Sequence, residues 1–191
     1  MKSGTRVLGI AESYAGDRSP GEPSTLAGVV VRLDRSVDGV VFGSLTIGGL
    51  DGTDAIIELF STLGREDVQY LLLSGIAPAW YNLLDLHAIY DRIDRPVCSV
   101  GFEESSGLGA PLEEAFSGEE LDRRFGIYER QPPRKRIEIA GRELYWRDVG
   151  IDREEATTLL SATTPEGGPR PEPLRVARLA ARAADRFRED L

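Results

Sequence analysis

Apolar and polar positions along the chain predict strands first and helices later. The segments 5–10, 26–33 and 37–47 are rich in apolar and β-branched residues, and only a turn at 34–36 separates the second from the third. This spacing predicts a strand followed by a β-hairpin, because it leaves no room for a helix. Residues 11–24, rich in Gly, Pro, Ser and Glu, are typical of a loop before the hairpin.

The next part of the chain alternates helical and strand patterns. Apolar residues recur at helical spacing over 51–63 and 83–93, and nearly continuous apolar runs cover 68–73 and 96–100. Such runs are typical of parallel strands buried on both faces. A hairpin-linked trio of strands followed by two helix–strand units is the order of the ribonuclease H-like fold. We therefore expect an α/β protein whose mixed sheet, an antiparallel trio plus parallel crossovers, is flanked by helices.

Beyond residue 101 the pattern predicts smaller elements attached to this core. The expected elements are helices at 117–131, 151–162 and 174–191 and a small hairpin over 136–146. A length of 191 residues fits one domain, residues 1–191. Its core would cover about 5–101, and a helical and hairpin extension about 109–191.

Composition narrows the class of protein. The chain carries 23 Lys and Arg against 32 Asp and Glu, a net charge of −9, and 41% of its residues are hydrophobic. A single Cys98 and a single His87 exclude a disulfide framework, a multi-cysteine zinc site and any two-histidine metal motif. With no run of 18 apolar residues and no secretory leader, we expect a cytoplasmic protein with no membrane partner. Only Lys2 and Lys135 are lysines, and an acidic chain poor in lysine suits a salt-rich cytoplasm.

Three acidic residues stand where a nuclease-like sheet would hold a divalent metal. Glu12 follows the first strand, and Asp51 and Asp54 follow the glycine turn that ends the hairpin. Carboxylates at strand ends suit Mg²⁺ or Mn²⁺. The structural alternative is an exposed Glu12, a helix cap at Asp51, and an Asp54 favoured by the helix dipole. If the chain is an enzyme, Glu12, Asp51 and Asp54 are the catalytic candidates, and Glu12 and Asp54 the metal ligands.

A loop with two aromatic residues is a candidate for stacking on a base. Trp80, Tyr81 and Asn82 follow the strand at 68–73, at the end of the sheet where ligands of α/β proteins bind. The alternative is that the rings fill space between a helix and the sheet, with Asn82 as a helix cap. The sequence favours neither interpretation.

The last predicted helix carries a ridge of arginines. Arg175, Arg178 and Arg182 recur at helical spacing and, with Arg186, fall within about 80° of one another. Such a ridge predicts phosphate contacts, and its structural alternative is a solvated face near a helix C-terminus. Residues 123–147 hold a further basic cluster with interleaved aromatic residues, which is either a binding surface or a solvated one.

Five segments together carry a family resemblance. They are RVLGIAES, VDGVVFGSLTIGGLDGTDAI, YLLLSGIAPAWYNLLDL, RPVCSV and PEPLRVARLAA. In this order, from about Arg6 to Ala184, they resemble an archaeal family catalogued as domain of unknown function 99 (endonuclease dU-like), related to endonuclease V. The resemblance implies a ribonuclease H-like fold and kinship with metal-dependent endonucleases that act at deaminated bases.

The chain departs from this family at three positions that matter for catalysis. Where the family usually has Asp at the end of the first strand, Asp at the end of the fourth and His in the last helix, this chain has Ala11, Ser74 and Arg178. Asp54 matches a position at which endonuclease V supplies an acidic ligand. A two-metal site needs bridging carboxylates, which Asp54 alone does not supply.

Three functional hypotheses follow. The first is an endonuclease V-like protein acting on deaminated-base nucleic acid, DNA more than RNA, through a rebuilt site with Mg²⁺ or Mn²⁺. The second is a catalytically inactive relative with a nucleic-acid-binding or regulatory role, in which Arg178 holds a phosphate in the old cleft. The third is a nucleotide or small-molecule binding protein that uses the aromatic loop. The sequence leaves the oligomeric state open.

Overall fold

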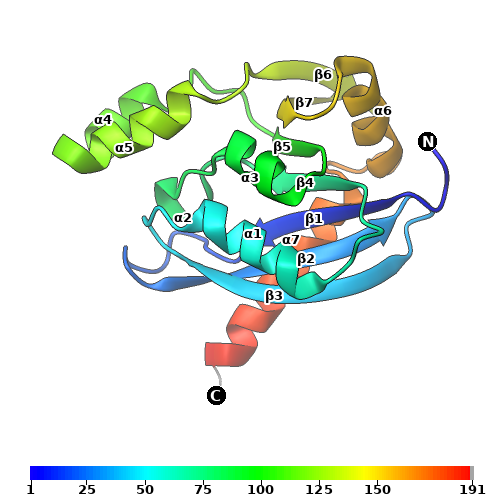
Figure 1. The fold of residues 1–191 in the computed structure, drawn as a ribbon, viewed down its shortest axis with the longest axis horizontal. Coiled ribbons are helices and arrows are strands. Elements are labelled where there is room, and N and C mark those ends of the chain that lie inside the picture. Colours follow the sequence, from blue (N-terminus) through cyan, green and yellow to red (C-terminus); the bar gives the residue numbers. More distant parts are fainter. Residues whose placement is uncertain (190–191) are drawn as a thin grey trace.

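A seven-stranded mixed sheet forms the centre of the protein, in the order β3-β2-β1-β4-β5-β7-β6 (Figure 1). The computed structural model describes residues 1–189. The neighbours β1–β4 and β4–β5 run parallel, and every other neighbouring pair runs antiparallel. The strands are β1 Arg6–Glu12, β2 Pro23–Arg32, β3 Val37–Thr46, β4 Tyr70–Ser74, β5 Val97–Gly101, β6 Lys135–Ile139 and β7 Arg142–Val149.

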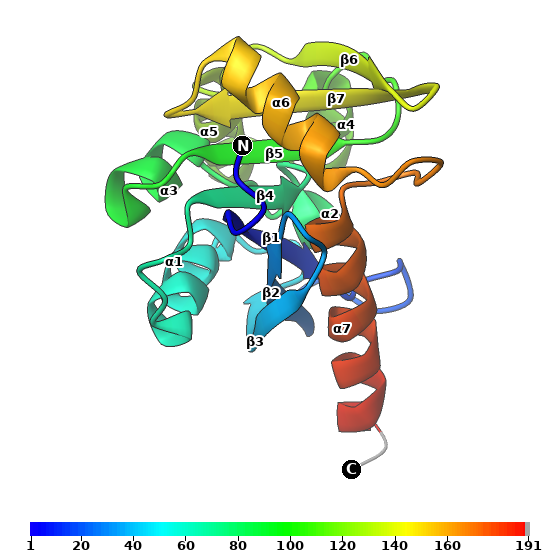
Figure 2. The same ribbon diagram turned by 90° about the vertical axis from the view of Figure 1, so that its right-hand side faces the viewer.

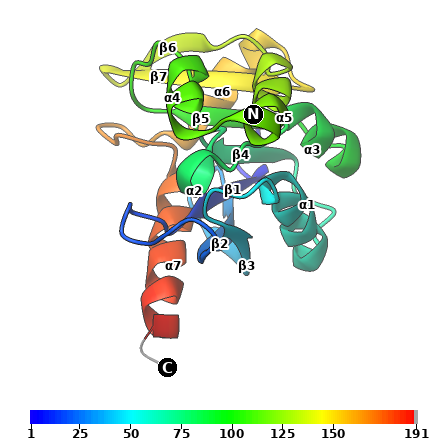
Figure 3. The same cartoon turned by 90° about the vertical axis from the view of Figure 1, so that its left-hand side faces the viewer.

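Helices cover both faces of this sheet. They are α1 Gly52–Leu63, α2 Pro78–Tyr81, α3 Leu86–Ile93, α4 Gly109–Ala115, α5 Gly118–Glu129, α6 Arg153–Thr163 and α7 Glu172–Glu189. α1 and α3 lie on one face, and α6 and α7 lie on the other (Figures 2 and 3). No helix within residues 1–189 is long and apolar enough to cross a membrane.

The order of the first five strands confirms the predicted ribonuclease H-like arrangement. β1, β2 and β3 form the antiparallel trio, and β4 and β5 add the two parallel strands. The predicted small hairpin is present as β6 and β7, but it is not an appendage. β7 pairs with β5 from Val97↔Val149 to Gly101↔Tyr145, so the hairpin extends the central sheet.

Several helix boundaries differ from those that the pattern predicts. α3 begins at Leu86 and not at residue 83, because the side chain of Asp85 accepts hydrogen bonds from the N–H groups of His87 and Ala88 and caps the helix there. α2 and α4 are short helices that the periodicity does not predict. α7 begins at Glu172, and the predicted helical end at Asp190 and Leu191 lies outside the described residues.

The core consists of the two faces of the central strands. β2 has eight consecutive buried residues, and Leu71, Leu72 and Leu73 of β4 are each at most 1% exposed. Leu71 and Leu73 pack toward α1 and α3, whereas Leu72 packs toward α6 and α7. Burial on both faces explains why these strands show apolar runs and no alternation.

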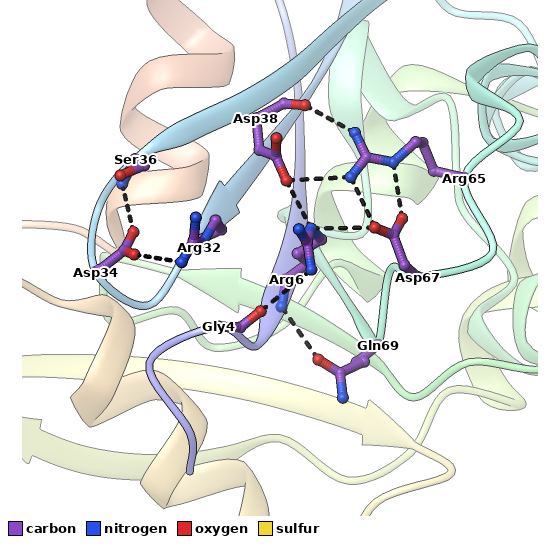
Figure 4. A network of polar contacts seen from close by, with 9 residues as sticks. All are labelled: Gly4, Arg6, Arg32, Asp34, Ser36, Asp38, Arg65, Asp67 and Gln69. Carbon is purple, nitrogen blue, oxygen red and sulfur yellow. Dashed lines mark hydrogen bonds and ion pairs between the residues drawn. The ribbon is translucent and has the colours of Figure 1, made fainter.

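An ion-pair network fixes the end of the sheet at which β1 begins (Figure 4). The side chain of Asp38 in β3 accepts from Arg6 at 2.6 Å and from Arg65 at 3.1 Å. Arg65 also binds Asp67 at 2.7 Å, and these hydrogen bonds lower the pKa of Asp67 to about 2. The network connects β1, β3 and the loop after α1 at the end opposite to the ends of β1 and β4.

The reactivity of Cys98 tests whether reagents in solution can reach this core. Its side chain is 0% exposed, and burial raises the pKa of the thiol to about 12. Because the thiolate is the reactive form, we expect iodoacetamide at pH 8 to leave Cys98 unmodified in the folded protein and to alkylate it in urea. Mass spectrometry measures both rates. Alkylation of the folded protein as fast as that of the unfolded protein would contradict the burial.

Candidate nucleic-acid interface

The carboxyl ends of β1 and β4 lie side by side, close to α7. These strands are parallel, with Ile10 opposite Leu73, so Ala11 and Ser74 follow at the same level of the sheet. Ala11 is 3% exposed and packs in one cluster with Ala177 of α7. A methyl group and a hydroxyl group therefore stand where the family resemblance implies two carboxylates.

Glu12 ends β1 and is half-buried. Its Oε2 accepts a hydrogen bond from the main-chain N–H of Tyr14 at 2.5 Å and from Ser24 Oγ at 2.7 Å. Ser24 Oγ lies 3.3 Å from Ser13 Oγ. Two donors therefore already engage the Glu12 carboxylate and hold it against the loop after β1 and the start of β2.

Asp51 precedes α1, and its carboxylate turns back toward the end of β3. It accepts hydrogen bonds from Thr46 N at 3.1 Å, Thr46 Oγ1 at 2.8 Å and Asn82 Nδ2 at 2.5 Å. Burial raises the pKa of Asp51, but the hydrogen bonds from Asn82 and Thr46 outweigh it, so the pKa lies below its ordinary value. Asp51 occupies the N-cap position of α1 without a side-chain capping bond, so it connects β3 to the loop after β4.

Asn82 makes the same link between β3 and the loop after β4 from the side of the loop. Its side chain is 0% exposed, its Oδ1 accepts from Gly52 N at 2.8 Å, and its Nδ2 donates to the carbonyl oxygen of Thr46 at 2.8 Å. The sequence placed Asn82 among the nucleic-acid contacts or at a helix cap. Complete burial removes it from the surface, and Asp85 caps the following helix.

The acidic candidates do not fit a magnesium or manganese site. Asp54 is exposed in the first turn of α1, and the carboxylates of Glu12 and Asp51 are engaged by the donors described above. Within residues 1–189, no group of three or more His, Cys, Asp or Glu side chains is placed to hold a metal ion. The positive charge of Arg178 near Glu12 further disfavours a cation there.

The arginines of α7 lie along one side of the helix, as the spacing predicts. Arg175 binds Glu172 at 2.6 Å, and Arg182 is exposed. Arg178 is half-buried, and its pKa is lowered first by burial and then by the charges of Arg182 and Arg170, against the opposing effect of Glu12. Arg178 follows Ala177, which packs with Ala11 of β1, and it lies near enough to two further guanidinium groups for their charges to lower its pKa. An excess of positive charge of this kind suits an anion.

Trp80 and Tyr81 lie on an unusual turn. Ala79, Trp80 and Tyr81 have φ values of 43°, 57° and 61°, so three consecutive residues other than glycine are in the left-handed region. The indole of Trp80 packs on Gly48, where a Cβ would lie 2.6 Å from the ring. Its ring centroid is 5.2 Å from that of Phe116, and Trp80 remains 36% exposed. Left-handed backbone of this kind persists only when the surroundings enforce it.

The side chain of Arg124 stabilises this turn through hydrogen bonds to main-chain carbonyl groups. The sequence counts it within a basic surface cluster, yet its side chain is 1% exposed. It donates hydrogen bonds to the carbonyl oxygens of Gly48 at 2.6 Å and Tyr81 at 3.3 Å, and its guanidinium lies 3.7 Å from the ring centroid of Phe116. Arg124 is therefore a structural residue that holds Trp80 and Tyr81 in place.

A cavity of about 250 Å³ is the main feature that the sequence interpretation missed. It opens beyond the carboxyl ends of β4 and β5, and its walls include three glycines and two tyrosines. The residues that matter for its chemistry are Gly75, Gly101, Gly107, Tyr128, Arg134, Tyr145 and Arg147. The guanidinium of Arg134 lies 4.1 Å from the ring centroid of Tyr145, and Tyr128 Oη accepts from Leu108 N at 3.0 Å. Trp80 and Tyr81 are not part of this wall.

The sheet order belongs to a known class of protein: the chain has the fold of endonuclease V. The structure of endonuclease V from Ciona intestinalis, in complex with a 24mer DNA containing an inosine followed by a ribo-adenosine, matches with a TM-score of 0.63. The identity is 12%, and the match covers 96% of this chain and 86% of that chain. A likeness at this identity shows the shared fold.

Within this class, the chain belongs to the endonuclease dU family, whose model matches residues 3–185. A UPF0215 protein from Pyrobaculum aerophilum is 35% identical over 185 residues, which is 96% of each protein. The crystal structure of a protein of unknown function from Archaeoglobus fulgidus matches with a TM-score of 0.80 and 26% identity. That match covers 94% of this chain and 98% of the other.

Proposed function

We propose that this protein binds nucleic acid through the arginine side of α7 and lacks the metal-dependent cleavage that the family resemblance implies. The observation that carries the proposal is the half-buried Arg178, which follows Ala177 in α7; Ala177 packs with Ala11 at the end of β1, and the charge of Glu12 acts on Arg178. A guanidinium group supplies positive charge and two parallel donors, which suits a phosphate oxygen pair. The same charge takes the place of the cation that a nuclease of this class would bind.

The cavity beyond β4 and β5 supports an unpaired base as the second contact. Its volume of about 250 Å³ falls just below the range of about 300–1,000 Å³ for sites of drug-sized ligands, so it suits a single aromatic ring system. The rings of Tyr128 and Tyr145 line the cavity, with the guanidinium of Arg134 on that of Tyr145, and a Cβ at Gly75 would have no neighbour within 4 Å. Proteins that read a base outside the helix use such a combination of stacking and edge contacts. An endonuclease V of the same fold is known in complex with DNA containing an inosine. We propose DNA with a deaminated base, in preference to RNA, as the partner.

A second candidate function uses the same cavity without a polymer. The wall residues Arg134 and Arg147 could bind the phosphate of a free nucleotide while Tyr128 or Tyr145 stacks on its base. Thermal stabilisation by a nucleotide, with no affinity for oligonucleotides, would favour this function over the first.

Binding of labelled oligonucleotides tests the main proposal. Single- and double-stranded DNA and RNA carrying uracil, hypoxanthine or no lesion would be titrated across a salt series, with Mg²⁺, Mn²⁺ or EDTA. We expect affinity that is unchanged by EDTA and no cleavage. Replacing Arg178 and Arg182 with alanine should weaken binding at least about tenfold and reduce the slope of log affinity against log salt by about 1 per lost phosphate contact.

Arg92→Ala is the matched control, because it removes an exposed arginine from α3 on the opposite face of the sheet. It should leave both affinity and salt slope unchanged. Equal losses in the control and in the α7 variants would contradict a specific role of α7. Cleavage that EDTA stops would overturn the proposed loss of metal chemistry, and Asp54→Ala would then test the remaining carboxylate.

A further inference from the structure

The two outer strands of the sheet differ in how they are protected. β6 carries Lys135, Arg136 and Glu138, and charged side chains on an edge strand discourage pairing with another strand. β3, at the opposite edge, has no charged residue from Gly39 to Thr46. Within the described residues β2 is its only neighbour in the sheet, so one side of its main chain from Gly39 onward is unpaired by another strand. The protection of β3 is confined to its beginning, where the register shifts at Asp38 and the carbonyl oxygen of Asp38 accepts from Arg65 Nη1 at 2.8 Å.

The uncovered face of β3 is apolar. Val40 and Phe42 are 48% and 50% exposed, whereas Val41 between them packs against the core beneath α1. Because side chains alternate along a strand, Val40 and Phe42 share the face of the sheet that carries α7. α7 packs on β1 and β2 and leaves this part of β3 open.

The end of α7 extends beyond the sheet. Figures 1 and 2 both show its last turns continuing past β3. Asp185 and Arg188 in these turns still contact the start of β2, because Thr25 Oγ1 donates to Asp185 Oδ1 at 2.6 Å and accepts from Arg188 Nη1 at 3.1 Å. Val176 and Ala180 pack against Val29 and Val31 of β2, and Ala183 and Phe187 continue the same stripe at helical spacing toward the open edge. Phe187 is 66% exposed. An apolar side of the helix thus overhangs the edge at which β3 is unpaired.

We propose that the protein forms a two-fold dimer in which the β3 strands of two copies pair antiparallel, with Val41 on the axis. In this register Val40 lies opposite Phe42 of the second copy, an aromatic and β-branched pair of the kind that stabilises sheets. Asp38 lies opposite Ser44 of the second copy, so no like charges face each other although each chain carries a net charge of −9. The contact is self-complementary, as a two-fold interface requires.

In the same dimer, the last turns of α7 would pack on the β3 strand of the second copy. A strand added to β3 lies about 4.8 Å beyond it, beneath the end of α7. The end of α7 contacts Thr25, which pairs with Ser44 of β3, and Ser44 lies opposite Asp38 of the second copy. Phe187 would then reach Val40, the next exposed apolar residue of that strand, and the reciprocal contact would form across the axis. Pairing and overhang therefore bury the same exposed residues in both copies, and the inference does not depend on the proposed function.

Sedimentation velocity of the full chain over a concentration series tests the dimer. We expect a dimer for the wild-type protein and a monomer for Phe42→Lys, which places a charge on the uncovered face of β3. Leu179→Lys is the control, because Leu179 is 56% exposed on α7 and points away from the sheet. It should remain dimeric. Circular dichroism spectra that match the wild type establish that both variants are folded.

Cysteine cross-linking tests the register. Residues directly opposite in an antiparallel pair have Cα atoms about 4.5–5.5 Å apart, within the range for a disulfide. Val41→Cys should therefore give a covalent dimer on oxidation, while Ser44→Cys, about 20 Å from its counterpart, should not. Cys98 is fully buried and does not compete. A wild-type monomer at every concentration, a dimer that survives Phe42→Lys, or cross-linking through position 44 alone would each overturn the proposal.

Discussion

Replacing Gly9 with alanine is expected to lower the free energy of unfolding by about 3 kcal/mol and to displace α7 from the sheet. A Cβ at position 9 would lie 2.6 Å from the Cβ of Pro173 and closer still to the main-chain carbonyl group of that residue. Gly9 lies in the middle of β1, and Pro173 lies in the first turn of α7. Because the clash involves main chain on both sides, no side-chain rotation relieves it.

The displacement should also weaken nucleic-acid binding, since Arg178 and Arg182 are carried by the same helix. Urea unfolding followed by circular dichroism measures the stability, and oligonucleotide titration measures the affinity. Gly101→Ala is the matched control for stability, because a Cβ there meets its nearest neighbours at 3.5 and 3.9 Å. We expect the control to stay within about 0.5 kcal/mol of the wild type. Equal stability of both variants would show that α7 does not approach β1 as closely as described.

The fold could be predicted from the sequence where one local signal decides the structure. The apolar run at 68–73 predicts a buried strand, and the short turn at 34–36 predicts a hairpin, because each depends on neighbouring residues. The place of β7 next to β5 could not be predicted in this way. Its pattern indicates a strand, but the choice of partner depends on contacts between residues about 50 positions apart, such as Val97 and Val149.

The site was harder to predict than the fold, because residue type does not reveal burial. Asn82 and Arg124 are polar, and the sequence predicts a surface contact or a helix cap for Asn82 and a place in a basic surface cluster for Arg124. Both are buried and bind main-chain groups near Gly48 and Gly52. The cavity near Tyr128 and Tyr145 is built from separate segments, so no single motif carries it. The basic and aromatic cluster at 123–147 was the available signal, and it did not distinguish a solvated surface from a wall of a cavity.

The three departures from the family pattern are consistent with one another. Ala11 and Ser74 each remove a negative charge relative to Asp, and Arg178 adds a positive charge relative to a neutral His, so the site gains about three units of positive charge. A site that had lost only one carboxylate would still attract a cation weakly. This combined change favours an anion in its place, which is why we propose retained binding to phosphate and not a weakened nuclease.

Replacing Asn82 with alanine is expected to lower the free energy of unfolding by about 3–5 kcal/mol. The substitution leaves Gly52 N–H without its acceptor. It also removes the Nδ2 group that donates to Asp51 at 2.5 Å and to the carbonyl oxygen of Thr46. All of these groups are at least partly buried, so water replaces the lost bonds poorly. In a protein of this size the melting temperature should fall by about 10 °C.

The pH dependence of the free energy of unfolding distinguishes the effect of Asn82→Ala from the effect of replacing an ordinary capping residue. The depressed pKa of Asp51 contributes stability above its unfolded pKa, and this contribution is lost as pH falls through the lower, folded pKa. Asn82→Ala removes the largest favourable hydrogen bond to that carboxylate, so its pKa rises and the variant loses less stability on acidification. The difference from the wild type should therefore narrow from pH 7 to about pH 3.

Asp152→Ala is the control, because it removes one exposed capping hydrogen bond, to Glu155 N at 2.8 Å, and should cost only about 1 kcal/mol. Urea unfolding at several pH values measures all three proteins. A loss of less than 1 kcal/mol for Asn82→Ala, or a difference that widens at low pH, would show that Asn82 does not hold Asp51. The left-handed turn at Trp80 and Tyr81 would then depend on Arg124 and on the main-chain hydrogen bond from Gly48 N to the carbonyl oxygen of Ala79 at 2.8 Å, and not on Asn82.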